Sequence, residues 1–295
     1  MYKGQRIILI APAYNEEQKI GEVVRRVPRE IVDGILVIDD GSTDRTAEVA
    51  ARQGAKVIEL GRVCGVGAAI RHGYQYAQQC SYDIVVTIAG NNKDSPEEVS
   101  RLLDPICDKG YDFVMGSRYL PGGFSGGEIP LYRRLSTRLH PLVVSMVSGR
   151  QVTESTNGYR AVKTSVLSDP RINLQQGWLD HYELEVYLLM KLLSLDYKCT
   201  EVPVSKIYPP RRIGNTKMRP VLDWWKMIKP ILLLGLSLRQ GPASADGRYQ
   251  QAKLQRRQVG RVVQGTLTTR HGRLSLWRHR YLPYGCRISC GRNRG

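Results

Sequence analysis

Short apolar runs and amphipathic segments alternate along the first 120 residues. Apolar runs of strand length, each followed by a polar or glycine-containing turn, occupy residues 6–13, 34–40, 55–61, 82–90 and 111–119. Segments with apolar residues at helical spacing lie between them, at residues 16–28, 45–54, 67–80 and 95–110. Repeated strand–helix units predict an α/β fold with a doubly wound, mostly parallel sheet flanked by helices. The order of the strands cannot be inferred from this pattern.

The regular alternation ends near residue 121. The pattern there predicts a Gly-rich loop at 121–130, helices at 131–149 and 181–196, and a strand at 198–208. Residues 219–239 form an amphipathic pattern, which indicates a helix that caps the core or lies in a membrane interface. The adjacent Trp224 and Trp225 beside lysines favour the interface, because indole rings prefer the headgroup layer.

Charge divides the chain into two parts. The formal net charge is +17, and residues 241–295 contain twelve Lys or Arg and one acid. We therefore expect an enzyme-like domain at 1–240. The segment 241–295 is expected to be a disordered, basic, low-complexity tail. Because the excess charge lies mainly in this tail, the sequence does not predict a nucleic-acid-binding protein, and RNA or lipid binding would concern the tail alone.

Acidic and aromatic residues follow the first two predicted strands. Tyr14 and Glu16 come after the first strand, and Asp39 and Asp40 end the second. Carboxylates at the edge of a sheet accept hydrogen bonds from a nucleobase or a ribose, and a tyrosine ring offers a stacking surface. Either loop alone is equally explained by turn chemistry. The two loops together, at successive strand ends, favour a nucleotide site.

Glycines and basic residues mark two further loops. Gly65 and Gly67 precede a helix, but they follow the third strand and lack the third glycine of a dinucleotide-binding motif. Arg118, Arg211 and Lys217 lie in later loops, where guanidinium and ammonium groups suit a diphosphate or an acceptor phosphate.

Six motifs in order resemble the inverting glycosyltransferases of family 2. They are APAYNEE, VIDDGSTD, GVGAAIRHG, GSRYLPGG, STNGYRAV and RRIGNTK, between residues 6 and 239. The nearest branch resembles the dolichyl- or polyprenyl-phosphate hexosyltransferases. The resemblance implies a GT-A fold over 1–240, with a nucleotide-binding half at 1–120 and an acceptor half at 121–240. It also implies a nucleoside-diphosphate sugar donor of the GDP-mannose or UDP-glucose type, and a polyprenyl phosphate acceptor.

The loops and the resemblance together imply a set of site residues. The expected nucleotide-sugar pocket comprises Pro12, Tyr14, Glu16, Ile38, Asp39, Asp40, Ala89, Gly90, Asn91, Arg118, Arg211 and Lys217. The residues expected to take part in catalysis are Lys93, Asp94, Arg118 and Lys217. Glu183 matches a family glutamate of unassigned role.

The metal motif is altered. The resemblance implies two aspartates that hold Mg²⁺ or Mn²⁺, whereas this chain has Ala89 and Asn91 there. One hypothesis is that Lys93 replaces part of the charge of the metal. Another is that Asp94, together with Asp40 and with Asn91 as a weak ligand, still binds a cation. A third is that catalysis is lost.

The expected activity is inverting transfer of a hexosyl group to polyprenyl phosphate. No signal peptide or membrane-spanning run is evident, so the expected location is the cytoplasm, peripheral to the inner face of the membrane. A first alternative is transfer to a hydroxyl of a glycan or small molecule, which needs a base such as Asp180 or Glu183. A second is a sugar-nucleotide-binding protein without catalysis.

Overall fold

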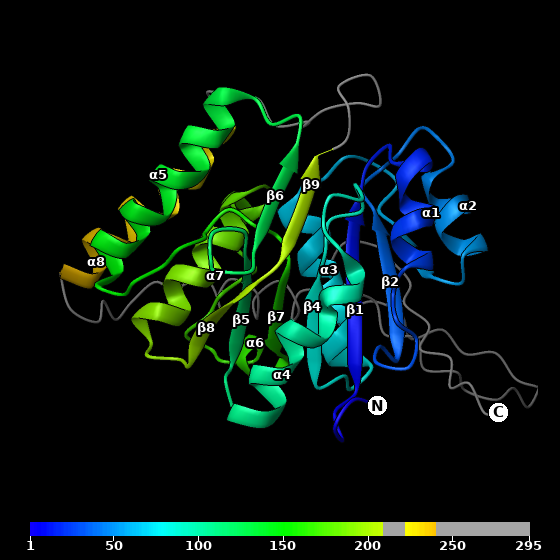
Figure 1. Cartoon of the computed structure of the whole chain (residues 1–295), viewed down its shortest axis with the longest axis horizontal. Coiled ribbons are helices and arrows are strands. Elements are labelled where there is room, and N and C mark those ends of the chain that lie inside the picture. Colours follow the sequence, from blue (N-terminus) through cyan, green and yellow to red (C-terminus); the bar gives the residue numbers. More distant parts are fainter. Residues whose placement is uncertain (209–221, 240–295) are drawn as a thin grey trace, which may run out of the picture. The chain divides into compact units, whose positions relative to one another are not determined.

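The computed structural model describes residues 1–208 and 222–239 (Figure 1). Arg211 and Lys217 of the expected site, and the basic tail, therefore lie outside the described residues. The sheet and the site described below belong to one unit of the chain, which comprises Met1–Gly235.

A seven-stranded sheet forms the centre of this unit. Its order is β3-β2-β1-β4-β7-β5-β8, and β7 is antiparallel to both neighbours while the other pairs are parallel. The strands are β1 (Ile7–Ala13), β2 (Gly34–Asp39), β3 (Lys56–Glu59), β4 (Ile84–Thr87), β5 (Phe113–Ser117), β7 (Arg160–Lys163) and β8 (Cys199–Pro203). The predicted α/β class and mostly parallel sheet are thus confirmed, whereas β7 was not predicted.

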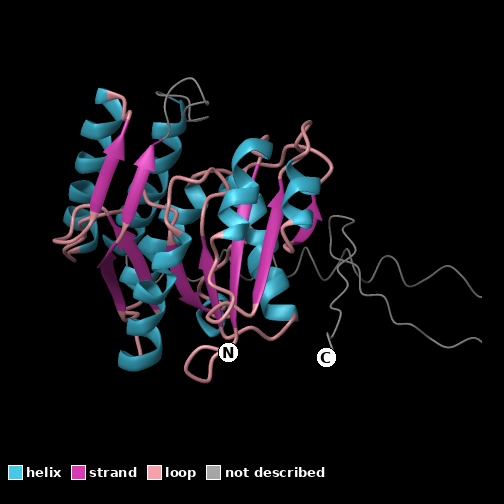
Figure 2. Cartoon of the chain, turned by 45° about the vertical axis from the view of Figure 1, so that its right-hand side comes forward, coloured by secondary structure: helices cyan, strands magenta, loops and turns pink. Residues whose placement is uncertain are grey.

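Helices flank the strands (Figure 2). One face packs against α1 (Glu17–Arg25), α2 (Thr46–Arg52) and α4 (Val99–Lys109), and the other packs against α3 (Val66–Gln79), α6 (Thr164–Leu167) and α7 (Glu183–Ser194). Short 3₁₀ turns lie at η1 (Pro96–Glu98) and η2 (Gly177–Leu179). Successive side chains along each strand point to opposite faces of the sheet, so each strand contributes residues to both packing layers. Ile7 and Leu9 join the core under α1 and α4, while Ile10 approaches Gly73 of α3.

A second, two-stranded sheet stands where a loop was expected. β6 (Phe124–Gly127) pairs in parallel with β9 (Ser205–Tyr208), so the prediction of a loop throughout 121–130 is wrong at these residues. The strand predicted at 198–208 is in fact two strands, β8 and β9, which belong to different sheets. The buried Val204 separates them, and its backbone N–H donates to the Ser117 carbonyl at 3.1 Å. Pairing with β9 stabilises an extended backbone in β6, although glycines have a weak preference for strands.

Two long helices pack against each other in the second half. α5 (Leu131–Ser148) and α8 (Leu222–Arg239) meet where His140 lies edge-on to Trp224 at 6.1 Å between ring centroids. α8 buries Met227 and exposes Trp225, so it covers the core with one side and presents apolar groups on another. None of the helices in residues 1–208 and 222–239 has the length and apolar content needed to span a bilayer.

Candidate functional site

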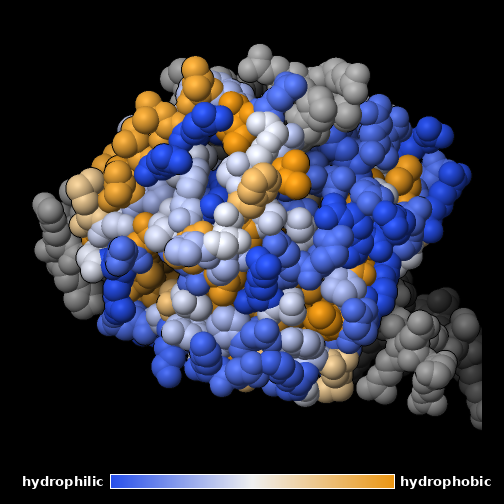
Figure 3. Space-filling model, in the orientation of Figure 1, coloured by the Kyte–Doolittle hydropathy of each residue, from blue (hydrophilic) through white to orange (hydrophobic). Residues whose placement is uncertain are grey.

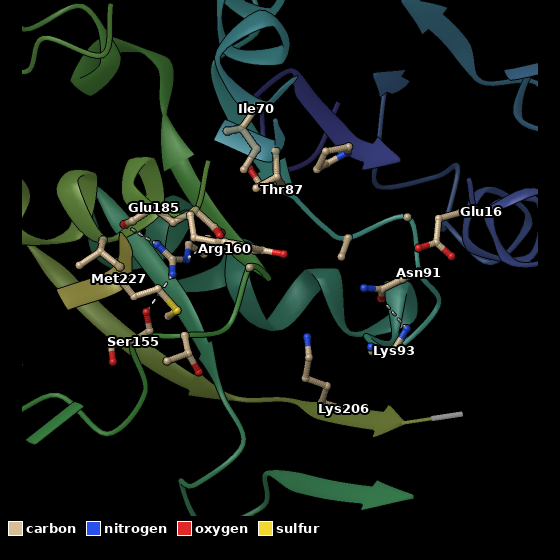
Figure 4. Close-up of a pocket in the computed structure, with 18 of the residues that line it drawn as sticks. Glu16, Ile70, Thr87, Asn91, Lys93, Ser155, Arg160, Glu185, Lys206 and Met227 are labelled. Carbon is tan, nitrogen blue, oxygen red and sulfur yellow. Dashed lines mark hydrogen bonds and ion pairs between the residues drawn. The ribbon is translucent and has the colours of Figure 1, made fainter. Parts of the chain in front are cut away.

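A cavity of about 190 Å³ lies at the edge of the sheet where β1 and β4 end and β7 begins (Figure 4). Pro12, Thr87 and Arg160 contribute to its lining from these three strands. α1 leaves β1 on one face of the sheet and α3 precedes β4 on the other, so a crevice opens between the two strands. Such a switch point in an open α/β sheet is the usual position of a ligand site.

The cavity brings together five of the twelve residues of the expected nucleotide-sugar pocket. The expected residues that line it are Pro12, Glu16, Ala89, Gly90, Asn91 and, from the expected catalytic set, Lys93. Expected residues that do not line it are Tyr14, Ile38, Asp39, Asp40, Asp94 and Arg118. In Figure 4, Asn91 and Lys93 lie near Glu16, whereas Arg160 and Glu185 lie at the opposite end of the cavity.

The two acidic loops hold each other in place. Asn15 occupies the left-handed region at φ 50°, and its side-chain oxygen accepts the Thr43 N–H at 2.8 Å. The Asn15 N–H in turn donates to the Ser42 hydroxyl at 2.9 Å, and that hydroxyl donates to Asp39. The polar side chains at these strand ends therefore hydrogen-bond to one another and to the backbone, and they fix the two loops.

Asp40 anchors the glycine loop before α3. Its carboxylate accepts the Cys64 N–H at 2.6 Å and the Gly65 N–H at 2.9 Å, and burial raises the pKa of Asp40 despite these bonds. A Cβ atom on Gly67 would overlap the backbone oxygens of Leu179 and His181. Gly67 thus permits close approach of the chain after η2.

Asp94 lies behind the cavity in a buried ion pair. Lys206 of β9 donates to its two oxygens at 2.6 and 2.8 Å, and Asp94 is 2% exposed. Lys206 also donates to the Asn157 side-chain oxygen at 2.9 Å. These three bonds use all three protons of the ammonium group, so both members of the pair are satisfied within the fold.

Lys93 projects from the same loop but faces the cavity. Its Nζ lies 5.1 Å from the centroid of the Tyr208 ring, and its backbone oxygen accepts the Ile207 N–H at 2.7 Å. Burial lowers the pKa of Lys93 to about 8, and the nearby charges of Arg133 and Lys206 act in the same direction. The loop after β4 is therefore fixed to β9 with one lysine directed at the ligand space.

Arg118 is a buried supporting residue in this structure. Its Nε donates to Glu154 at 2.7 Å, one terminal nitrogen donates to the Tyr208 hydroxyl at 2.8 Å, and the other donates to Thr156 at 2.9 Å. Neither Arg118 nor Glu154 is appreciably exposed. Direct contact of Arg118 with a phosphate in the cavity would require this network to break, so the expectation of a phosphate ligand finds no support in its position.

Five charged residues of the cavity escaped the sequence interpretation: Lys19, Arg133, Arg160, Glu185 and Lys206. Arg160 stands in the STNGYRAV motif, and it donates to the backbone oxygens of Asn157 and Glu185. For Lys206 a local signal existed, because strand alternation places it on one face with the buried Val204 and Tyr208. A lysine on an apolar strand face indicates a buried charge with a partner.

The candidate bases lie elsewhere. Asp180 forms an ion pair with Arg71, and Glu183 is buried outside the cavity, where burial raises its pKa.

Among the residues that the structure describes, no three His, Cys, Asp or Glu side chains come together in a way that could hold a metal ion. Asn91 contributes an amide to the cavity, and its side-chain oxygen accepts the Lys93 N–H at 3.3 Å.

Comparison with known proteins identifies the family. The sequence model of the family described as glycosyl transferase family 2 matches residues 8–168 of this chain. The polyprenol monophosphomannose synthase of Mycolicibacterium smegmatis is 31% identical, over 72% of this chain and 81% of that protein. The dolichyl-phosphate hexose transferase of Haloferax volcanii is 32% identical, over 74% of this chain and 89% of that protein.

A solved structure supports the fold. The glucosyl-3-phosphoglycerate synthase of Mycobacterium tuberculosis, in complex with Mn²⁺, UDP and glucosyl-3-phosphoglycerate, superposes with a TM-score of 0.56 at 23% identity. The match covers 82% of each chain. With a mostly parallel sheet, a crevice at its switch point and a family match across more than half of its length, this chain is a glycosyltransferase of family 2 with a GT-A fold.

Proposed function

We propose that this glycosyltransferase transfers a hexosyl group from a nucleoside-diphosphate sugar to a polyprenyl or dolichyl phosphate. The names of the relatives from M. smegmatis and H. volcanii support a polyprenyl or dolichyl phosphate acceptor. The donor is of the GDP-mannose or UDP-glucose type, and the reaction takes place at the cytoplasmic face of a membrane.

The observation that carries the proposal is that α5 contributes to the cavity lining with one side and exposes apolar residues on another. Arg133 on this helix lines the cavity, while Leu131 and Met146 on another side are 78% and 75% exposed. The exposed apolar residues recur at intervals of three or four and so share one face; they are Leu131, Leu135, Leu139, Leu142 and Met146. One helix therefore joins an apolar surface to the ligand space.

That apolar face has the character of a membrane-binding surface (Figure 3). A contiguous stripe of exposed leucines on a water-soluble domain marks an interaction site, and an amphipathic helix with basic flanks suits a bilayer interface. Arg134 and Arg138 on α5 are exposed beside the stripe, and Trp225 of α8 is 60% exposed. An acceptor with its hydrocarbon chain in the bilayer would present its phosphate next to Arg133.

The chemistry needs no general base on the protein. A phosphate oxygen of the acceptor attacks C1 of the sugar as the bond from C1 to the diphosphate oxygen breaks. The electron pair leaves with the nucleoside diphosphate, and the configuration at C1 inverts. The acceptor is already anionic at neutral pH, so the residues of the cavity have to position both phosphates and stabilise the leaving charge. The positions of Asp180 and Glu183 outside the cavity agree with this scheme.

The experiment is a transfer assay with radiolabelled GDP-mannose and UDP-glucose and two acceptors, a long-chain polyprenyl phosphate in anionic vesicles and a short-chain, water-soluble analogue. We expect one donor to yield a lipid-extractable product from both acceptors. Label that enters only water-soluble glycans or sugars would support the hydroxyl-acceptor alternative. Failure to consume either donor would support the non-catalytic one.

The double variant Leu135→Asp/Leu142→Asp separates membrane binding from chemistry. We expect it to lower vesicle binding by at least about tenfold, since each leucine loses its favourable burial. Transfer to the short-chain acceptor should be unchanged. A control matched in charge, Gln18→Asp/Gln53→Asp, adds the same two negative charges at exposed residues away from α5 and should affect neither measurement.

A further inference from the structure

The cavity contains more cationic groups than its own acids neutralise. Five basic side chains line it: Lys19, Lys93, Arg133, Arg160 and Lys206. Two carboxylates, Glu16 and Glu185, share the lining. Glu16 pairs with Lys19 at 3.0 Å, and Glu185 lies 3.7 Å from Arg160. A ligand that enters the cavity therefore meets a net positive field, which suits a diphosphate.

The acid nearest to the cavity along the loop after β4 is not available to a metal ion. Both oxygens of Asp94 accept hydrogen bonds from Lys206, within 2.8 Å, and the carboxylate is almost completely buried. A cation that replaced Lys206 would leave the ammonium group buried without a partner, which is strongly unfavourable. Ala89 offers no ligand atom, and Asn91 offers one neutral oxygen.

Lys93, unlike Asp94, forms no ion pair among the residues that the structure describes. It is 7% exposed, and no carboxylate in the described part of the chain forms an ion pair with its ammonium group. A buried ammonium group without an ion-pair partner is costly, so its position suits an anion from outside the fold. Its loop is held by the hydrogen bond from the Ile207 N–H to the Lys93 carbonyl and by the ion pair of Asp94 with Lys206.

A divalent ion does not fit this set of groups. Mg²⁺ and Mn²⁺ prefer several hard oxygen ligands, and at this position they would stand beside the ammonium group of Lys93, which carries the same sign of charge. The donor set therefore differs from that expected of an enzyme that binds a metal–nucleotide complex.

We propose that this chain binds the diphosphate of its donor without a divalent cation, and that the Lys93 ammonium group takes the place of the metal charge. Asp94 and Lys206 are positioning residues that hold the Lys93 loop against β9. The inference rests on the proposed function, because it requires that the ligand of the cavity is a nucleoside diphosphate. During transfer Lys93 stabilises the charge that develops on the departing diphosphate.

The test is isothermal titration calorimetry of the full chain with GDP and with UDP, in EDTA and again in MgCl₂ or MnCl₂. We expect at least one nucleotide to bind, with a dissociation constant that agrees within about twofold between the two conditions. Lys93→Met should weaken binding at least about tenfold in EDTA, as expected for loss of a charge-assisted hydrogen bond. Lys93→Arg should retain most of the affinity, and Lys109→Met, at an exposed lysine of α4, should bind as the unchanged chain does.

The outcomes are distinguishable. Binding that requires Mg²⁺ or Mn²⁺ in the unchanged chain overturns the inference and leaves the proposed function intact. Metal-free binding that Lys93→Met does not weaken, with circular dichroism confirming that the variant is folded, also overturns it. If Lys93→Met does not fold, the wild-type titrations and Lys93→Arg still decide the matter. The absence of binding by either nucleotide in every condition overturns the proposed function together with the inference.

Discussion

The loops on the two sides of the cavity are held by different interactions. After β1 and β2, the loops are joined by hydrogen bonds between small polar side chains and backbone amides, such as that from Asn15 N–H to Ser42 at 2.9 Å. On the other side, the segment 153–157 is held by buried charges. Arg118 binds Glu154, and Glu201 accepts the N–H groups of Thr153 and Glu154 at 2.9 and 2.8 Å.

This difference has energetic consequences. A lost hydrogen bond at a half-exposed turn is partly replaced by water, so each bond contributes little to the net free energy of unfolding. Removal of one partner of a buried ion pair leaves a charge that water cannot reach, which is far more costly. The loops after β1 and β2 should therefore tolerate substitutions, whereas the segment 153–157 should not.

The largest effect is expected for Arg118→Met. This change leaves Glu154 buried without its counter-charge, and we expect it to lower the free energy of unfolding by about 3–5 kcal/mol. Urea denaturation followed by circular dichroism measures the loss. The double variant Arg118→Met/Glu154→Gln should recover part of it, because the glutamine is neutral and its side-chain oxygen still accepts the Thr156 N–H. A fully stable Arg118→Met that has lost transfer activity would instead support direct phosphate contact by Arg118.

An intermediate effect is expected for Gly67→Ala, at the junction of α3 with the chain after η2. The added methyl group meets backbone oxygens of Leu179 and His181, which have little freedom to move, so we expect a loss of about 1–3 kcal/mol. Thermal denaturation provides the measurement. Gly177→Ala is the matched control, because a Cβ at that exposed glycine has nothing within 4 Å. Equal stability of the two variants would show that the close approach at Gly67 is relaxed in solution.

The smallest effect is expected for Ser42→Ala, in the loop after β2. The change removes the hydroxyl that links Asn15 to Asp39, and we expect a loss of about 1 kcal/mol. Thr43→Ser serves as control, because it keeps both bonds of residue 43 to Asn15, from the backbone N–H at 2.8 Å and from the side-chain hydroxyl at 3.4 Å. A loss from Ser42→Ala as large as that from Arg118→Met would remove the proposed difference between the two sides of the cavity.

Part of the site was predictable from residues close together in the chain. Pro12, Glu16 and Asn91 line the cavity as expected, because they follow parallel strands whose carboxyl ends share one edge of the sheet. The residues interpreted as ligands at the end of β2 were harder to assign. Asp40 has the same sequence pattern whether it contacts a nucleotide or, as here, the N–H groups of Cys64 and Gly65.

The sequence by itself determined the alternation of strands and helices, the positions of the loops and the family motifs. Apolar periodicity and turn chemistry act over a few residues, so they are visible locally. Only the tertiary structure decided the strand order, the antiparallel insertion of β7 and the pairing of Asp94 with Lys206, 112 residues away. These features depend on contacts between distant segments. Whether a buried lysine is neutralised, as Lys206 is, or faces the cavity without an ion-pair partner among the described residues, as Lys93 does, depends on which distant side chain lies beside it.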